Sequence, residues 1–148
     1  MSIAKRSEII FLYDLSWGNP NGDPNDANKP RIDSETGINV VTDVRLKRTI
    51  RDELISRNYD ILIRDTFNEE DGTLKDAKNR GVDFLPESAK PKANKSNKDK
   101  STLTKEELKE FQDNVKKCID IRMFGCVLPS DIKNASLQYT GPVQFKMG

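Results

Sequence analysis

At positions 19–24 the chain reads Asn19-Pro-Asn-Gly-Asp-Pro24, and at positions 41–51 it reads Val41-Thr-Asp-Val-Arg-Leu-Lys-Arg-Thr-Ile-Arg51. The first stretch is dense in turn formers, since Gly22 can adopt positive φ, proline fixes φ, and asparagine and aspartate bond to nearby backbone. The second stretch has apolar residues at helical spacing. Together they predict a long polar loop that leads into a strongly basic helix.

The start and the two faces of this helix follow from its residues. Thr42 suits the N-cap, and Asp43 suits the positive end of the helix dipole. Leu46, Ile50 and Leu54 recur on one side and predict a buried face. Four residues that share a positive charge fan across the opposite side: Arg45, Lys47, Arg48 and Arg51. A solvated helix face usually mixes both charges, so this arc is either such a face or a surface that binds phosphate.

The remaining elements predict an α+β domain in the order βαβ, insertion, αβ. Glu8–Asp14 is almost continuously apolar and predicts a buried central strand, and Asn58–Arg64 predicts a second strand. Thr104 and Glu107 form a capping-box pattern at the start of a helix expected over 105–127. Residues 137–145 predict a last strand that a Gly-Pro pair interrupts. This order resembles the RNA-recognition-motif layout, although the usual stacking aromatics are not evident.

The composition changes after Asp65. The stretch at 89–102 carries five lysines and few apolar residues, so it cannot bury enough surface to fold alone. We therefore expect a charged, partly disordered insertion at 66–102 within a single domain that spans 1–148. This insertion is either a flexible connection or a lysine-rich arm that becomes ordered on RNA.

The composition also excludes several classes of site. The 148 residues include no histidine, the commonest general base and zinc ligand. Cys118 and Cys126 stand alone, which favours two core residues and suits a reducing cytoplasm. No apolar stretch is long enough to span a membrane. We expect no metal and no cofactor.

Six motifs occur in order along the chain and carry a family resemblance. They are Phe11-x-x-Asp14, Asn19-Pro-Asn-Gly-Asp-Pro24, Pro30-Arg-Ile-Asp33, Val41-Thr-Asp-Val-Arg-Leu-Lys-Arg-Thr-Ile-Arg51, Asp120-Ile-Arg-Met-Phe-Gly125 and Gly141-Pro-Val-Gln-Phe145. In this order they resemble the repeated backbone subunit of type I CRISPR Cascade complexes, the Cas-seven family. The closest form is that of subtype I-B, the Csh type. The resemblance covers residues 7–146.

The resemblance implies a modified RNA-recognition-motif (ferredoxin-like) palm with inserted fingers and a thumb. It implies copies that assemble head to tail along a CRISPR RNA in antiviral defence, together with other Cascade subunits and with target DNA bound through the guide. Family members usually continue well past the last motif, so the chain looks like an incomplete, N-terminal half of the fold.

The resemblance also places the RNA contacts. Family members hold the guide backbone through the loop and first helix, and the matching positions are Arg31, Thr42, Arg45, Lys47, Arg48 and Arg51. The loop residues Asn19, Asn21 and Gly22 allow the RNA backbone to approach closely, or serve only to form turns.

Two other classes of function compete with this interpretation. Related backbone subunits of type III complexes cut RNA with a loop aspartate, and four aspartates here could gather a divalent ion: Asp14, Asp23, Asp26 and Asp33. The motifs match type I, in which this subunit is not the nuclease, so we expect a non-enzymatic protein. The third alternative is a nonspecific protein-interaction module, which would retain no RNA at moderate salt.

Overall fold

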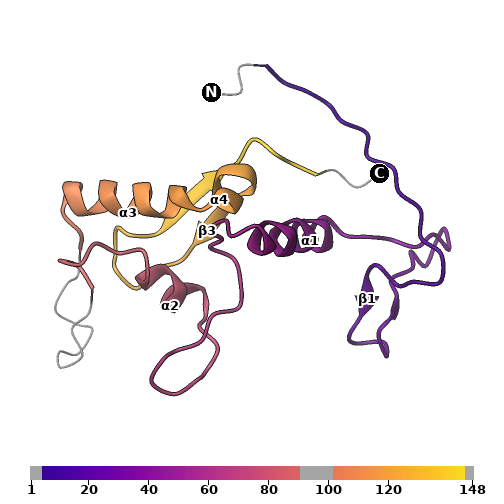
Figure 1. Cartoon of the computed structure of the whole chain (residues 1–148), viewed down its shortest axis with the longest axis horizontal. Coiled ribbons are helices and arrows are strands. Elements are labelled where there is room, and N and C mark those ends of the chain that lie inside the picture. The colour runs from indigo at the N-terminus through magenta and orange to yellow at the C-terminus, as the bar shows by residue number, and fades with distance from the viewer. Residues whose placement is uncertain (1–4, 91–101, 146–148) are drawn as a thin grey trace. The chain divides into compact units, whose positions relative to one another are not determined.

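The computed structural model describes residues 5–90 and 102–145 (Figure 1). The elements in this part are α1 (Asp43–Ser56), α2 (Ala77–Val82), α3 (Lys105–Lys117), α4 (Ile119–Phe124), β1 (Gly22–Asp23), β2 (Lys29–Pro30), β3 (Gly125–Leu128) and β4 (Leu137–Thr140). The strands form two antiparallel pairs, β1 with β2 and β3 with β4. This mixture confirms the α+β class, while the RNA-recognition-motif layout stays a prediction. The chain forms two compact units, Met1–Arg45 and Leu46–Gly148.

In the first unit the turn-rich stretch folds into a short hairpin. β1 and β2 pair with Gly22 opposite Pro30. The Asn28 N–H closes the turn by donating to the Asp23 carbonyl oxygen at 2.9 Å. Gly22 does not use the positive φ that glycine can adopt. A Cβ at this position would collide with the side chain of Asn28, so the glycine permits a close approach instead.

A second chain reversal follows the hairpin. Ile32 and Asn39 form an antiparallel bridge across it. The Asp33 carboxylate accepts hydrogen bonds from the Glu35 N–H at 3.0 Å and from the Thr36 hydroxyl at 2.9 Å. The Glu35 N–H and then the Thr36 hydroxyl lower the pKa of Asp33 from its ordinary value. The predicted long loop is therefore two successive tight turns.

The apolar segment Glu8–Asp14 runs extended without a partner strand in the described part of the chain (Figure 1). Ile9 and Leu12 are each 87% exposed. A strand forms only through hydrogen bonds to a neighbouring strand, and no described strand pairs with this segment. The prediction of a buried central strand here is therefore wrong for this structure.

The hydrophobic core of the second unit lies along α3. Phe111 and Val115, one helical turn apart, are 2% and 0% exposed. Cys126 packs against the core, and Cys118 is part of it, which confirms the interpretation of both cysteines. The core residues are Leu62, Leu85, Ala89, Leu103, Phe111, Val115, Cys118, Ile121, Leu128 and Ala135.

The segment predicted as a second strand, Asn58–Arg64, has no strand structure. Ile61 and Leu62 are nevertheless buried, with 1% and 3% exposure. The N–H groups of Leu62 and Ile63 donate to the Asp120 carboxylate, each at 3.0 Å, rather than to a neighbouring strand. The strand prediction is wrong because a side chain satisfies the backbone groups that a sheet would have paired.

The capping box at the start of α3 is confirmed. The Thr104 hydroxyl accepts the Glu107 N–H at 3.2 Å, and the Glu107 carboxylate accepts the Thr104 N–H at 3.0 Å. The helix ends at Lys117, however, because Cys118 has an extended conformation with ψ of 126°. The helix predicted over 105–127 is therefore broken at Cys118 into α3 and α4, and the prediction is wrong at this break and over 125–127, which belong to β3. Beyond the break, Ile121 in α4 and Leu128 in β3 pack into the same core as α3.

The backbone at the start of β3 passes close to the backbone at the end of β4. The predicted last strand is confirmed over Leu137–Thr140 and ends before Gly141. Gly125 has φ of 81° and ψ of −177°, and a Cβ there would collide with the carbonyl oxygen of Tyr139. A Cβ at Gly141 would collide with the carbonyl oxygen of Met123. Glycine is therefore required at positions 125 and 141, because the two backbone segments lie too close together to leave room for a Cβ.

Part of the predicted insertion contributes to the core. Phe67 and Leu74 form an antiparallel bridge around an acidic turn. α2 follows, with the Asp76 side chain accepting the Asn79 N–H at its start. The buried Leu85 then reaches the core. Residues 91–101, which include most of the lysine-rich stretch, lie outside the described residues. None of the helices in the described ranges is long and apolar enough to cross a membrane.

Candidate nucleic-acid interface

The residues predicted to bind RNA divide between the two units. The first unit contains Asn19, Asn21, Gly22, Arg31, Thr42 and Arg45, and the second contains Lys47, Arg48 and Arg51. The unit boundary falls within α1, after its first three residues.

Asn21 connects the hairpin to the chain that leads into α1. It is only 8% exposed. Its side-chain Nδ2 donates to the Val40 carbonyl oxygen at 3.1 Å, and its own carbonyl oxygen accepts the Arg31 N–H at 3.3 Å. Asn19 supports the same turn by donating from Nδ2 to the Asn28 carbonyl oxygen at 2.6 Å. Both asparagines therefore have a defined structural role in shaping the loop.

The start of α1 is fixed by Thr42 and Arg45. The Thr42 hydroxyl accepts the Arg45 N–H at 3.3 Å, which confirms the predicted N-cap. The Nε of Arg45 donates to the Pro20 carbonyl oxygen at 3.1 Å. A residue predicted to bind phosphate thus also attaches the loop to the helix start.

Arg31 and Arg48 form ion pairs that are open to solvent. The Arg31 guanidinium lies 3.7 Å from the Asp23 carboxylate, and these two side chains are 42% and 31% exposed. Arg48 lies 3.0 Å from Asp52 and 3.4 Å from Asp65. The hydrogen bond and charge of Asp52, then the charge of Asp65, raise the pKa of Arg48 above its already high value. Both cations are accessible, although each already has a carboxylate partner.

Arg51 differs from the other cations because it is buried. Its side chain is 9% exposed, and its Nε donates to the fully buried Asp120 carboxylate at 3.2 Å. Its guanidinium also lies 5.3 Å from the centre of the Phe124 ring. The expectation that four cations share one exposed arc is wrong for Arg51, since a buried carboxylate 69 positions away draws it into the interior.

Lys47 lies at the edge of the same cluster. Its ammonium is 5.9 Å from the centre of the Phe124 ring, a distance at which the ring attracts the cation. Lys47 is half-buried, so its position is restricted more than that of a lysine on a fully exposed helix face.

The residue that the sequence reasoning missed is Asp120. Its carboxylate binds Arg51 and the N–H groups of Leu62 and Ile63, and it thereby joins α1, the 60–63 segment and α4. The available signal was a single aspartate between two apolar residues, Ile119 and Ile121. An acidic residue in that position requires a buried partner.

Three of the four aspartates of the competing metal hypothesis serve other contacts. Asp23 accepts the Asn25 N–H at 3.0 Å, and Asp26 accepts a hydrogen bond from Lys29 at 3.0 Å. Asp33 accepts two hydrogen bonds within its own turn. In residues 5–90 and 102–145, no three carboxylate or thiol side chains come together in a way that could hold a metal ion.

Comparison with known proteins identifies relatives. A family model described as CRISPR-associated protein Cas7 matches residues 5–148. A CRISPR-associated protein Cas7 from Haloferax volcanii is 47% identical over 66 residues. Those residues are 45% of this chain and 19% of the relative, so the chain spans about a fifth of that relative's length in the alignment.

Proposed function

We propose that this chain, which belongs to the Cas7 family of CRISPR-associated proteins, binds the sugar–phosphate backbone of a CRISPR RNA. In this proposal it is a non-catalytic backbone subunit of a type I Cascade complex of subtype I-B. The observation that carries the proposal is the attachment of the loop to the start of the basic helix, through Asn21 to Val40 and Arg45 to Pro20. This attachment presents the cationic residues of the first unit from a defined backbone.

The chemistry of guide binding favours contacts to phosphate. Guides differ in sequence and share only their backbone, and phosphate contacts position a strand without reading its bases. Arginine binds phosphate through two parallel N–H donors, and lysine acts as a point charge. Both residue types are present on α1 and in the loop before it.

The strength of the existing ion pairs decides which cations are available to RNA. Solvent-exposed pairs contribute about 0–1 kcal/mol, so a phosphate can compete with Asp23 for Arg31 and with Asp52 for Arg48. Removing one partner from a buried pair costs about 3–5 kcal/mol, so Arg51 stays with Asp120. We assign phosphate binding to Arg31, Arg45, Lys47 and Arg48, and a supporting role to Asn19, Asn21, Gly22, Thr42 and Arg51.

The exposed apolar segment supports the proposed assembly of copies with one another and with other Cascade subunits. Phe11 is 70% exposed and Ile10 is 87% exposed. An apolar run of this length usually marks a surface that another protein covers. In the proposal, this segment becomes a strand of the RNA-recognition-motif palm when the complex forms.

The first test measures how RNA affinity depends on salt. Replacing Arg31 or Lys47 by glutamine is expected to weaken binding to a similar extent for every RNA sequence. The slope of log affinity against log salt should become shallower by about 0.7 for each lost phosphate contact, the value typical of single strands. Lys133→Gln, which removes an exposed lysine of the second unit, is the matched control. An unchanged slope in both test variants contradicts the assignment.

The second test identifies the RNA. The chain is purified with bound nucleic acid at moderate salt, and the retained RNA is sequenced. Repeat-flanked spacer RNAs are expected, and random cellular RNA would reduce the proposal to nonspecific affinity. Cleavage of the RNA that depends on a divalent metal and is lost on Asp33→Ala would favour the endonuclease alternative.

A further inference from the structure

Phe124, the last residue of α4, contacts two cations of α1. The Arg51 guanidinium carbon lies 5.3 Å from the centre of its ring, and the Lys47 ammonium nitrogen lies 5.9 Å from it. Lys47 and Arg51 are one helical turn apart on α1, as Asp120 and Phe124 are on α4. Because Arg51 also binds Asp120, two residues of one helix meet two residues of the other, all within the second unit.

A second aromatic ring packs against Phe124. The centre of the Phe145 ring lies 6.0 Å from that of Phe124, with 43° between the two ring planes. The Val143 N–H donates to the Met123 carbonyl oxygen at 2.8 Å, which attaches the segment that carries Phe145 to the end of α4. Phe124 is only 6% exposed, so its ring is closely packed and has little freedom to turn away from the cations.

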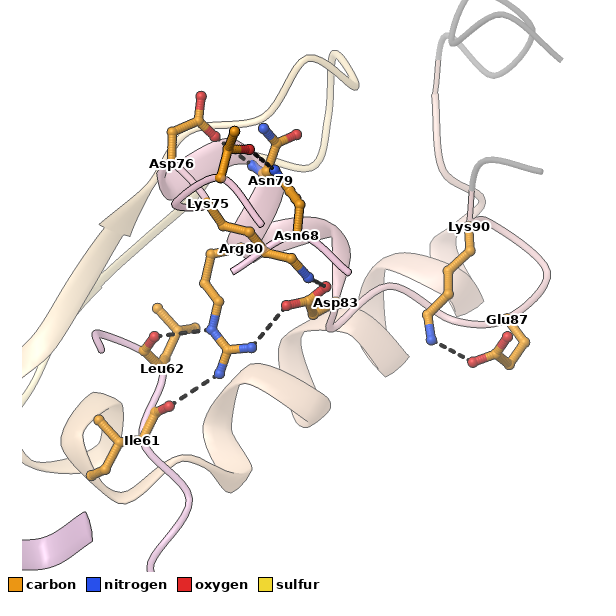
Figure 2. A network of polar contacts seen from close by, with 11 residues as sticks. Ile61, Leu62, Asn68, Lys75, Asp76, Asn79, Arg80, Asp83, Glu87 and Lys90 are labelled. Atoms are coloured by element: carbon orange, nitrogen blue, oxygen red, sulfur yellow. Dashed lines mark hydrogen bonds and ion pairs between the residues drawn. The ribbon is translucent and has the colours of Figure 1, made fainter. Parts of the chain in front are cut away.

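An aromatic ring and a carboxylate hold a cation in different ways. A carboxylate offsets the charge of the cation, as Asp83 does for the Arg80 guanidinium in Figure 2. A ring attracts the cation through its negative face but has no net charge, so this contact leaves the charge of the cation for an anion. The contact with Phe124 also restricts the flexible side chain of Lys47 before any RNA binds, which reduces the entropy lost on binding.

We infer that Phe124 and Phe145 form an aromatic platform that positions Lys47 for contact with phosphate. Phe124 restricts the ammonium, and Phe145 keeps the Phe124 ring in its orientation. The role of the platform rests on the proposed function, in which Lys47 contacts the guide backbone, and both aromatic residues act through that lysine. The platform also gives a role to the motifs at 120–125 and 141–145, which contribute none of the assigned phosphate contacts.

The first measurement weakens the ring as a cation partner while preserving its shape. Phenylalanine with one, two or three fluorine atoms is incorporated at position 124 of the full chain, and the affinity for a single-stranded oligouridine is measured. Fluorine withdraws electron density from the ring face, so the affinity is expected to fall with each added fluorine. The total loss should be about threefold, as for one cation–π contact near the surface. An affinity that does not depend on fluorination at position 124 overturns the proposal.

Phe84 is the matched control for fluorination. The Arg80 guanidinium lies 4.8 Å from its ring, so the same kind of contact is present. That guanidinium donates to the Ile61 and Leu62 carbonyl oxygens and to Asp83 (Figure 2), and it has no assigned role in RNA binding. Fluorination at position 84 should therefore leave the affinity unchanged, and equal losses at positions 84 and 124 would overturn the proposal.

A double-mutant cycle then assigns the effect to Lys47. Phe145→Leu is expected to weaken RNA binding about threefold in the unaltered chain. In a chain that already carries Lys47→Gln it should have little further effect, because both changes act on the same phosphate contact. Losses that simply add would overturn the proposal, since a general loss of stability acts independently of Lys47.

A measurement without RNA separates the platform from the proposed function. The ring current of Phe124 shifts the NMR signals of the Lys47 methylene protons, and Phe124→Leu is expected to move them to the position of an exposed lysine such as Lys133. Signals that do not move overturn the platform. If Lys47→Gln weakens RNA binding but fluorination at position 124 does not, the platform is overturned and the phosphate contact stands. If Lys47→Gln binds RNA as the unaltered chain does, the phosphate contact fails, and the positioning role fails with it.

Discussion

Asp120 is completely buried, and its two oxygens accept hydrogen bonds from one guanidinium and two backbone N–H groups. At the scale of single residues, this carboxylate determines the position of Arg51 and the path of the chain at Leu62. A buried charge is tolerated when it is paired and hydrogen-bonded, and Asp120 has both a guanidinium partner and two backbone donors. Arg51 is therefore needed for the fold that presents the neighbouring cations.

The first prediction concerns this carboxylate. Asp120→Asn is expected to lower the free energy of unfolding by about 3–5 kcal/mol, because it leaves the Arg51 guanidinium buried without a counter-charge. The introduced amide also points a donor toward other donors. Urea unfolding followed by circular dichroism measures the change.

The control for this prediction is a second aspartate in an ion pair. Asp131→Asn removes the partner of Lys78, and these side chains are 79% and 50% exposed. Its cost should be about 0–1 kcal/mol, the range of exposed pairs. Equal costs for the two variants would show that burial of the Arg51–Asp120 pair contributes nothing.

At the scale of elements, the sequence predicted those that local interactions specify. The N-cap at Thr42 and the capping box at Thr104 depend on residues three positions away, and both are confirmed. The strand expected at Glu8–Asp14 requires a partner strand, and the one expected at Asn58–Arg64 lost its backbone donors to Asp120. Apolar periodicity cannot reveal either circumstance, because it reports which residues are buried and not what pairs with their backbone.

The same distinction applies to the candidate interface. Its polar loop and basic helix follow from turn chemistry and helical spacing. The buried position of Arg51 depends on Asp120, which is 69 positions away in the sequence. No local pattern could separate Arg51 from the exposed Arg48.

The second prediction concerns the glycine at the start of β3. Gly125→Ala is expected to lower stability by more than about 3 kcal/mol, because its φ and ψ lie in a region that only glycine adopts and because the new methyl group meets the Tyr139 carbonyl. Thermal or urea unfolding measures the loss.

Gly72→Ala is the matched control, since Gly72 also has positive φ, 67°, with no atom within 4 Å of the added Cβ. It should cost about 1–2 kcal/mol, the strain of a left-handed conformation alone. A cost for Gly125→Ala no greater than this would mean that the backbones of β3 and β4 can move apart.

At the scale of the whole molecule, the two units differ in how much apolar surface they bury. The second unit has a continuous core, whereas the first contains a run of exposed apolar residues: Ile9, Ile10, Phe11, Leu12, Tyr13 and Leu15. The first unit is held mainly by hydrogen bonds within its turns. Its apolar run is the clearest surface for association in the described part of the chain.

The third prediction follows from that exposure. A double variant, Ile10→Lys with Leu12→Lys, is expected to reduce self-association of the chain while leaving the helix content unchanged, because these side chains support no described contact. Sedimentation velocity at several protein concentrations measures the association. Val127→Lys, at another exposed apolar residue, is the control. Self-association that persists in the double variant but disappears in the control would move the association surface to β3.

The Arg51–Asp120 pair also has a consequence for the order of folding. α1 is a local element that can form within microseconds, whereas a contact across 69 positions must wait until the intervening chain is ordered. We therefore expect α1 to form early and to dock late, when the carboxylate of α4 is already in place. The helix that carries Lys47 and Arg48 would then acquire its fixed orientation only in one of the last steps of folding.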